Sequence, residues 1–241
     1  VIKTDASDTK RKLDGIVFEV VDSEGNTVSI FETDQNGRGE SGWLPFKEEF
    51  ILREKETKEG FVLSGEEYHF ILDAEHQSFE YRIENQPTGV RVSKISERGE
   101  PLAGAGFAVK KAGFLQSILP FTKADEGVYR YDPNGKETTL MTDENGKLLI
   151  LELPNAEYWL EEAVIPEGYF PAAPTAFTVT EKDTYKTPLE IDIQNSPWVK
   201  LGLDTDKYNR LIAALLIGIG AGIPILIIIR HRKKQREDKE A

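Results

Sequence analysis

The chain has 241 residues, of which 42 are acidic and 30 are basic, and its formal net charge is −12 at pH 7. It contains no cysteine, which excludes disulfides, thiolate nucleophiles and cysteine-bound metals. The C-terminal tail from Arg230 holds six basic and three acidic residues, so the rest of the chain carries −15. This acidity argues against nucleic acid or an anionic lipid surface as its partner.

Short segments of alternating apolar and polar residues extend from the N-terminus to about Ser196, separated by Gly, Asn, Asp and Pro turns. This period-two pattern is typical of strands, and no long amphipathic helix interrupts it. The sequence therefore predicts an all-β protein over this part of the chain.

An internal repeat divides the β-rich part. Thr33 to Gly37 reads TDQNG and Thr142 to Gly146 reads TDENG, at an offset of 109 residues, and a Leu-Pro pair follows each motif. Asn-Gly favours a tight hairpin turn. A calcium loop is the weaker interpretation, because the rest of the EF-hand spacing is absent. The repeat predicts a first domain at 1–87 and a second at 88–197.

The second copy is longer than the first by about twenty residues between Phe107 and Thr142. This insertion contains the apolar stretch from Gly113 to Phe121, GFLQSILPF. Two interpretations stay open: a ligand-binding patch, or a loop that folds back onto the core of its own domain.

Six polar residues lie at positions where strand alternation predicts an inward-facing side chain. They are Lys3, Glu54 and Asn85 in the first copy, and Lys94, Glu162 and Asn195 at the matching places in the second. A buried lysine tends to lose its charge, and a neutral amine is a nucleophile. A protonated glutamic acid beside it could polarise the asparagine amide and move protons, giving a Lys-Asn amide bond and ammonia. The alternatives are a buried salt bridge with a hydrogen-bonded asparagine, or strand ends that emerge into solvent.

These residues resemble the collagen-adhesin B-type (Cna B) domains, also called SpaA-like pilin or prealbumin-like domains, of Gram-positive surface proteins. The most specific element is the E-box, a pattern like Tyr-x-Leu-x-Glu-Thr-x-Ala-Pro-x-Gly-Tyr, which here runs from Tyr158 to Tyr169. In the first copy it runs from Phe50 to Phe61 and has Lys58 where the family has Pro. The resemblance covers about 1–197 and implies two tandem prealbumin-like (Ig-like) β-sandwiches.

The resemblance also implies what the six inward-facing residues do. The family's isopeptide lysine falls on Lys94 and Lys3, its asparagine on Asn195 and Asn85, and its catalytic glutamate on Glu162 and Glu54. Each glutamate acts once within its own domain, so the protein is not expected to be an enzyme. No cofactor and no metal are implied.

The segment from Leu211 to Ile229 is uncharged over 19 residues. As a helix it would measure roughly 28 Å, which matches the hydrocarbon core of a bilayer. The basic tail at 230–241 favours a cytoplasmic C-terminus by the positive-inside rule, after a juxtamembrane linker at 198–210. The sequence thus predicts one C-terminal transmembrane helix with the β-rich part outside the cell. Because Val1 is preceded by no export signal, we expect a processed or truncated form.

In the family, a Leu-Pro-x-Thr-Gly sorting signal precedes such a helix. In this chain the place of the sorting signal is taken by the segment from Leu201 to Asp206. Only Thr205 fits the pattern, and the Pro and Gly of the signal are missing. This favours a permanent membrane anchor over attachment to the cell wall. The sequence therefore predicts a pilin-like or adhesin-like surface stalk whose partners are a host or extracellular-matrix protein or other surface subunits. The alternative is a single-pass receptor or anchor subunit that recruits membrane or cytoplasmic partners.

Overall fold

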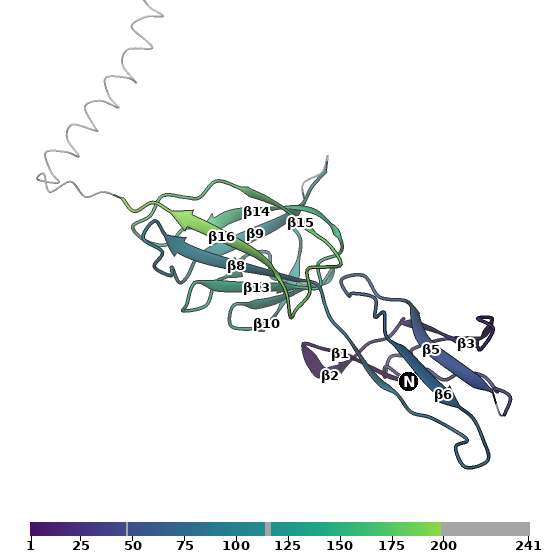
Figure 1. Ribbon diagram of the computed structural model, residues 1–241. Coiled ribbons are helices and arrows are strands. Elements are labelled where there is room, and N and C mark those ends of the chain that lie inside the picture. Colours follow the sequence, from purple (N-terminus) through teal and green to yellow (C-terminus); the bar gives the residue numbers. More distant parts are fainter. Residues whose placement is uncertain (47, 114–116, 199–241) are drawn as a thin grey trace, which may run out of the picture. The chain divides into compact units, whose positions relative to one another are not determined.

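The structure is a computed structural model that describes residues 1–46, 48–113 and 117–198. Every helix or strand assigned in these ranges is a β-strand, so the all-β prediction is confirmed for this part of the chain (Figure 1). Within the same ranges, no helix is long and apolar enough to cross a membrane.

Several predictions concern residues that lie outside the described ranges. These are the transmembrane helix at 211–229, the tail at 230–241, Thr205, and the linker at 198–210 beyond its first residue.

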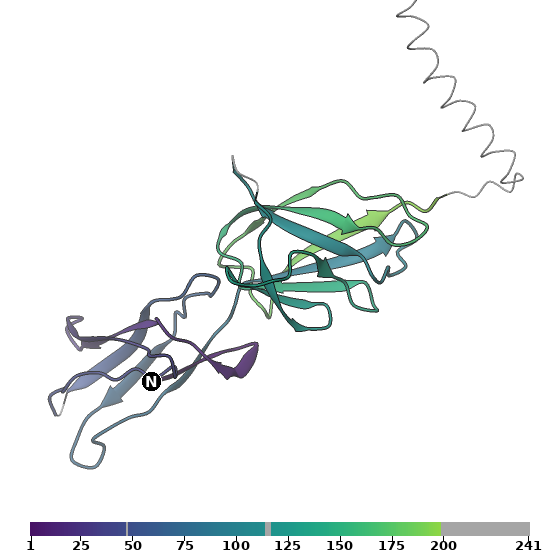
Figure 2. The same ribbon diagram turned by 180° about the vertical axis from the view of Figure 1, so that it is seen from behind.

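The first copy of the repeat forms two sheets (Figures 1 and 2). One has the strand order β2 (Asp8–Lys12), β1 (Ile2–Asp5), β7 (Arg82–Asn85). The other has the order β4 (Thr27–Glu32), β3 (Val17–Asp22), β5 (Glu49–Glu56), β6 (Glu67–Ile71). The first and last strands of this copy, β1 and β7, are neighbours and run parallel.

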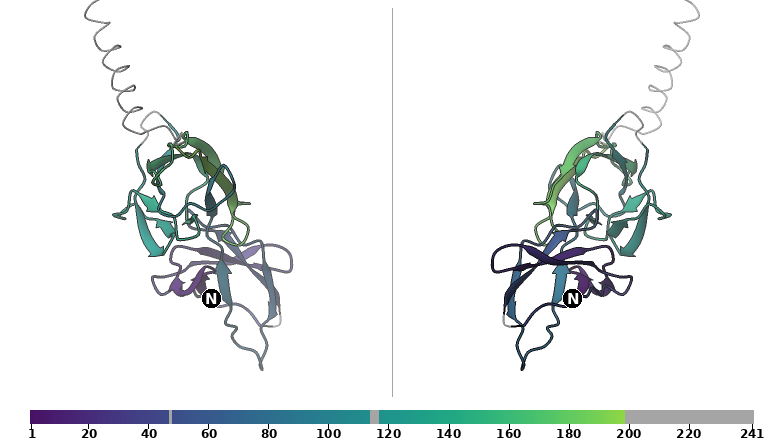
Figure 3. Two further views of the ribbon diagram at one scale, coloured as in Figure 1. Left: turned by 90° about the vertical axis from the view of Figure 1, so that its left-hand side faces the viewer. Right: turned by 90° about the vertical axis from the view of Figure 1, so that its right-hand side faces the viewer.

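The second copy also forms two sheets, which Figure 3 shows on opposite sides of one interior. One has the order β10 (Phe121–Asp125), β11 (Val128–Tyr131), β13 (Lys147–Leu151), β8 (Gly89–Ser96), β16 (Leu189–Asn195). The other has the order β12 (Leu140–Met141), β9 (Gly106–Lys111), β14 (Ala156–Val164), β15 (Thr175–Val179). Again the first and last strands, β8 and β16, pair in parallel.

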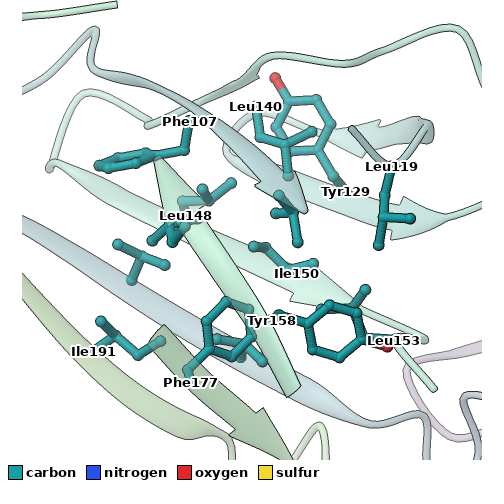
Figure 4. Close-up of a cluster of buried hydrophobic side chains, with 14 of the residues drawn as sticks. Phe107, Leu119, Tyr129, Leu140, Leu148, Ile150, Leu153, Tyr158, Phe177 and Ile191 are labelled. Carbon is teal, nitrogen blue, oxygen red and sulfur yellow. The ribbon is translucent and has the colours of Figure 1, made fainter. Parts of the chain in front are cut away.

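Alternating side chains of the two sheets fill the core of the second copy (Figure 4). Leu148 and Ile150 of β13 face Phe107 and Tyr158 of the other sheet, and all four are almost fully buried. Each such side chain contributes about 1.5 to 3 kcal/mol through removal of its apolar surface from water. The Tyr158 hydroxyl donates a 2.7 Å hydrogen bond to the carbonyl of Pro154, which satisfies its polar end.

The repeated Asp-x-Asn-Gly motifs form tight turns in both copies. The Asp143 carboxylate accepts hydrogen bonds from the backbone N–H groups of Asn145 at 2.9 Å and Lys147 at 2.7 Å. Gly146 has a φ of 67°, a conformation in which a glycine avoids the strain of a Cβ. The aspartate therefore serves the turn itself, as the hairpin interpretation predicts.

The insertion in the second copy contributes structure of its own. Its later part forms the β10 and β11 hairpin, which joins the sheet through a parallel pairing of β11 with β13. Leu119 and Phe121 are buried in the core of their own domain. For these residues the structure supports the loop that folds back onto the core.

Candidate functional site

Lys3 lies in the middle of β1 and is fully buried. Its Nζ donates a 2.6 Å hydrogen bond to Oδ1 of Asn85 and lies 2.8 Å from Oε2 of Glu54. The Nδ2 group of Asn85 donates to Oε1 of Glu54 at 2.5 Å and to the Thr57 hydroxyl at 2.8 Å. Amine, carboxamide and carboxylate thus contact one another pairwise inside the first domain.

The second domain holds the same triad. Lys94 is fully buried, and its Nζ donates a hydrogen bond to Oδ1 of Asn195 and lies 3.1 Å from Oε1 of Glu162. The Nδ2 group of Asn195 donates to both oxygens of Glu162, at 2.9 and 3.1 Å. The backbone N–H of Ala172 donates to Oε2 of the same glutamate at 2.7 Å.

Strand register explains why residues so far apart in the sequence meet. In the parallel pair of β8 and β16, Lys94 lies opposite Ile193, and Asn195 follows two residues later on the same face. The glutamate comes from β14 in the facing sheet, at a register shift between Glu162 and Val164. Bulges of this kind re-aim side chains.

The first copy repeats this arrangement. Lys3 lies opposite Ile83 in the parallel pair of β1 and β7, and Asn85 is two residues further on. Glu54 comes from β5 in the facing sheet, next to a register shift in the pairing of β3 with β5. The Lys58 departure from the E-box pattern lies on the surface, where its Nζ is 2.7 Å from Asp14 Oδ1.

Both lysine amines are removed from solvent. Burial lowers the pKa of Lys3 and of Lys94, although the adjacent glutamate opposes the shift in each case. A phenylalanine ring lies over each amine, with the ring centroid of Phe18 at 5.5 Å from Lys3 Nζ and that of Phe107 at 5.9 Å from Lys94 Nζ. Burial thus increases the share of neutral, nucleophilic amine at a given pH, whereas the ring face and the glutamate favour the charged form.

The structure therefore brings the six residues that the sequence singles out together as two triads, one in each domain. It contradicts the alternative in which the strand ends emerge into solvent, because both glutamate side chains are 1 % exposed and the lysines are fully buried. A buried salt bridge with a hydrogen-bonded asparagine describes the same contacts without any further reaction.

Sequence reasoning missed two partners of the triads. The Thr57 hydroxyl holds the carboxamide of Asn85 in the first domain, and the backbone N–H of Ala172 holds the carboxylate of Glu162 in the second. Neither has a sequence signal: Thr57 occupies the place where the E-box pattern has Ala, which predicts no hydroxyl there, and a backbone donor leaves no trace in residue type.

Comparison with protein families identifies the domains. The family described as SpaA, a prealbumin-like fold domain, matches twice, at residues 1–87 and 88–195. The chain belongs to this family. Its prealbumin-like fold therefore confirms the resemblance stated from the sequence, in two tandem copies.

Three examples illustrate the solved structures that are similar to this SpaA-family chain. The shaft pilin SpaA from Lactobacillus rhamnosus GG is 16 % identical with a TM-score of 0.42, covering 83 % of this chain and 97 % of the pilin. The Bacillus anthracis TIE protein is 18 % identical with a TM-score of 0.44, covering 81 % and 33 % respectively. A streptococcal ancillary pilin is 23 % identical with a TM-score of 0.35, covering 81 % and 60 %. A search of curated proteins gives no match.

Proposed function

We propose that this chain is a cell-surface stalk protein, pilin-like or adhesin-like, whose two domains each form one internal Lys-Asn isopeptide bond. The bonds join Lys3 to Asn85 and Lys94 to Asn195. The observation that supports this proposal is the same buried Lys-Glu-Asn triad at matching places in both domains.

The reaction needs no external reagent. The neutral lysine amine attacks Cγ of the asparagine, and a new C–N bond forms as the C–Nδ2 bond breaks. The glutamic acid polarises the carboxamide, accepts a proton from the attacking nitrogen and delivers one to the leaving nitrogen, which departs as ammonia. Contacts of the glutamate with both nitrogens suit this transfer, since Glu162 lies 3.1 Å from Lys94 Nζ and 2.9 Å from Asn195 Nδ2. Because the product is the protein itself, each glutamate acts once.

The remaining parts of the proposal concern position in the cell. A membrane helix at 211–229 would anchor the two domains outside the cell. There the isopeptide bonds would give a cysteine-free protein covalent cross-links that reductants do not cleave. Other surface subunits, or a host or matrix protein, would be the partners of the stalk.

The mass of the denatured full chain tests the chemistry. Two bonds predict a mass lower than the sequence value by two ammonia molecules, about 17 Da each. Digestion should then give one branched peptide that joins Lys94 to Asn195 and another that joins Lys3 to Asn85. A measured mass equal to the sequence value, with no ammonia lost, would reject the proposal.

Matched variants test the role of the glutamate. Glu162→Ala should regain one ammonia mass and lose the Lys94 branch, whereas Glu161→Ala should keep both bonds. Glu161 is the neighbour on β14 whose carboxylate instead lies 2.6 Å from Lys110 Nζ. If Glu162→Ala folds and still has the parent mass, Glu162 is not the catalyst.

A further inference from the structure

The stalk function assigns no role to the hairpin that the second copy adds between Phe107 and Thr142. In the described part of the first copy, the corresponding stretch holds one strand, β4. The second copy adds β10 and β11, which extend its sheet next to β13. On β11, Tyr129 is buried in the core, so its neighbour Arg130 lies on the opposite face of the sheet. The added hairpin thus presents an arginine away from the core of its own domain.

Arg130 contacts the first domain. Its Nη1 lies 2.9 Å from Oδ2 of Asp5 and 2.6 Å from Oε1 of Glu152, and its Nη2 donates a 2.9 Å hydrogen bond to the Ser7 hydroxyl. Arg11 on β2 completes a ring of alternating charges, because its Nη1 lies 2.5 Å from the same oxygen of each carboxylate. Each domain therefore supplies one arginine and one carboxylate to the ring.

A serine takes the place of Asp5 in the second copy. Asp5 lies opposite Asn85 where β1 pairs with β7, and Ser96 lies opposite Asn195 where β8 pairs with β16. The Ser96 hydroxyl accepts hydrogen bonds from two backbone N–H groups of the turn that follows it. A neutral acceptor is thus sufficient for the turn at this end of a domain.

Asp5 has one carboxylate oxygen more than the turn requires. Its Oδ1 accepts a 2.7 Å hydrogen bond from the N–H of Ser7, whereas its Oδ2 faces Arg11 and Arg130. The side chain of Asp5 is fully buried, and a buried charge that loses a partner is strongly destabilising. The second oxygen therefore fits a cation supplied by the other domain.

The backbone at the junction is equally specific. Among the residues that the structure describes, Glu152 is the only one other than glycine with a positive φ, 66°, a conformation that persists where the surroundings impose it. A Cβ on Gly60 of the first domain would lie 2.3 Å from the carbonyl oxygen of Glu152, so a glycine is needed there. Thr88 bridges the two segments: its N–H donates to the carbonyl of Gly60 at 2.8 Å, and its hydroxyl donates to the carbonyl of Leu153 at 2.7 Å.

We propose that the β10–β11 hairpin is a docking element for the first domain, and that the contact of Arg130 with Asp5 makes the junction a fixed joint. The partner of this surface is the β1–β2 end of the same chain, as the complementary charges indicate. Bending at the joint would withdraw Arg130 from a buried carboxylate, so the two domains should move as one body. The proposal goes beyond the stalk function and does not depend on whether the isopeptide bonds form.

Distances between two spin labels on the full chain test the joint. Because the chain has no cysteine, Val28→Cys on β4 and Thr178→Cys on β15 place the labels at two exposed positions, one in each domain. Double electron–electron resonance should then give one narrow distance distribution. Arg130→Ala should broaden it roughly twofold, because domains joined by a weak interface move relative to each other.

Arg91→Ala is the matched control. Arg91 lies on β8 in the same sheet, and its Nη1 is 2.6 Å from Oε1 of Glu190 within the second domain. This substitution should leave the distribution unchanged. Equal widths for Arg130→Ala and Arg91→Ala would overturn the proposal.

Asp5→Asn tests the same contact from the first domain and gives the answer if Arg130→Ala does not fold. It keeps the shape of the side chain without its charge and should also broaden the distribution. The double variant should be no broader than the broader single variant, since both residues act through one contact. Widths that increase additively in the double variant would also overturn the proposal.

Discussion

Replacing Asn195 by alanine removes the carboxamide that Lys94 would attack and leaves the charged pair in place. Lys94 Nζ still lies 3.1 Å from Glu162 Oε1, so no buried charge loses its partner. The substitution therefore isolates the effect of the bond from the large cost of an unpaired buried lysine.

The size of the effect follows from the loop that the bond closes. Lys94 and Asn195 are 101 residues apart in the sequence. In the chain-entropy account of cross-links, closing a loop of this length stabilises the folded state by about 4 to 5 kcal/mol. The lost hydrogen bonds of the carboxamide add about 1 kcal/mol. We expect Asn195→Ala to lower the free energy of unfolding of the second domain by about 5 to 6 kcal/mol.

Denaturant unfolding of the full chain, followed by tryptophan fluorescence, measures this loss. Trp159 on β14 is partly buried, whereas Trp43 and Trp198 are exposed and change little on unfolding. Gln194→Ala is the control, because that neighbouring side chain on β16 points to solvent. Equal midpoints for Asn195→Ala and Gln194→Ala would refute the reasoning.

Three further predictions concern pH, turn formation and the first domain. In Asn195→Ala the buried Lys94 keeps its amine, whose pKa in the folded state lies below the ordinary 10.5. At pH values between the folded-state pKa and the unfolded-state pKa, the unfolded chain therefore binds more protons than the folded chain. The stability of Asn195→Ala, measured as the urea midpoint, should therefore rise with pH over this range. Adding Lys94→Met should abolish the rise. Asp143→Ala removes the acceptor of two backbone N–H groups and should cost about 1 to 2 kcal/mol in thermal unfolding, unlike Glu144→Ala. Thr57→Val should slow bond formation in the first domain alone, seen as a delayed loss of one ammonia mass after refolding.

Much of the fold and of the site could be predicted from the sequence, because strand geometry has a period of two. Alternation alone places Lys94 on the inward face with Val92, and Asn195 with Ile193, and the structure buries all four. The repeat offset adds the matching triad of the first copy. The parallel pairing of the first and last strands, which the structure shows, brings the lysine and the asparagine of each domain together.

The parts that sequence reasoning missed depend on tertiary structure. Alternation predicts that Phe79 faces inward, but its side chain is 42 % exposed and lies against the rings of Phe70 and Tyr81. The segment after Gly39 matches the later part of β13 in the repeat but forms no strand, and its Gly42 N–H donates to the Ser29 hydroxyl at 3.2 Å instead. The support of Glu162 by the Ala172 backbone depends on how a loop returns, which residue types do not reveal.

Parallel pairing of the first and last strands has a mechanical meaning. Tension along the chain enters the second domain at Gly89 and leaves after Asn195. Once Lys94 and Asn195 are joined, that tension passes along six residues of β8 and across the new amide. The 101-residue loop between them then carries none of it. If the loop could open, the chain would lengthen by roughly 340 Å; with the bond closed, the domain acts as an inextensible link and not as a spring.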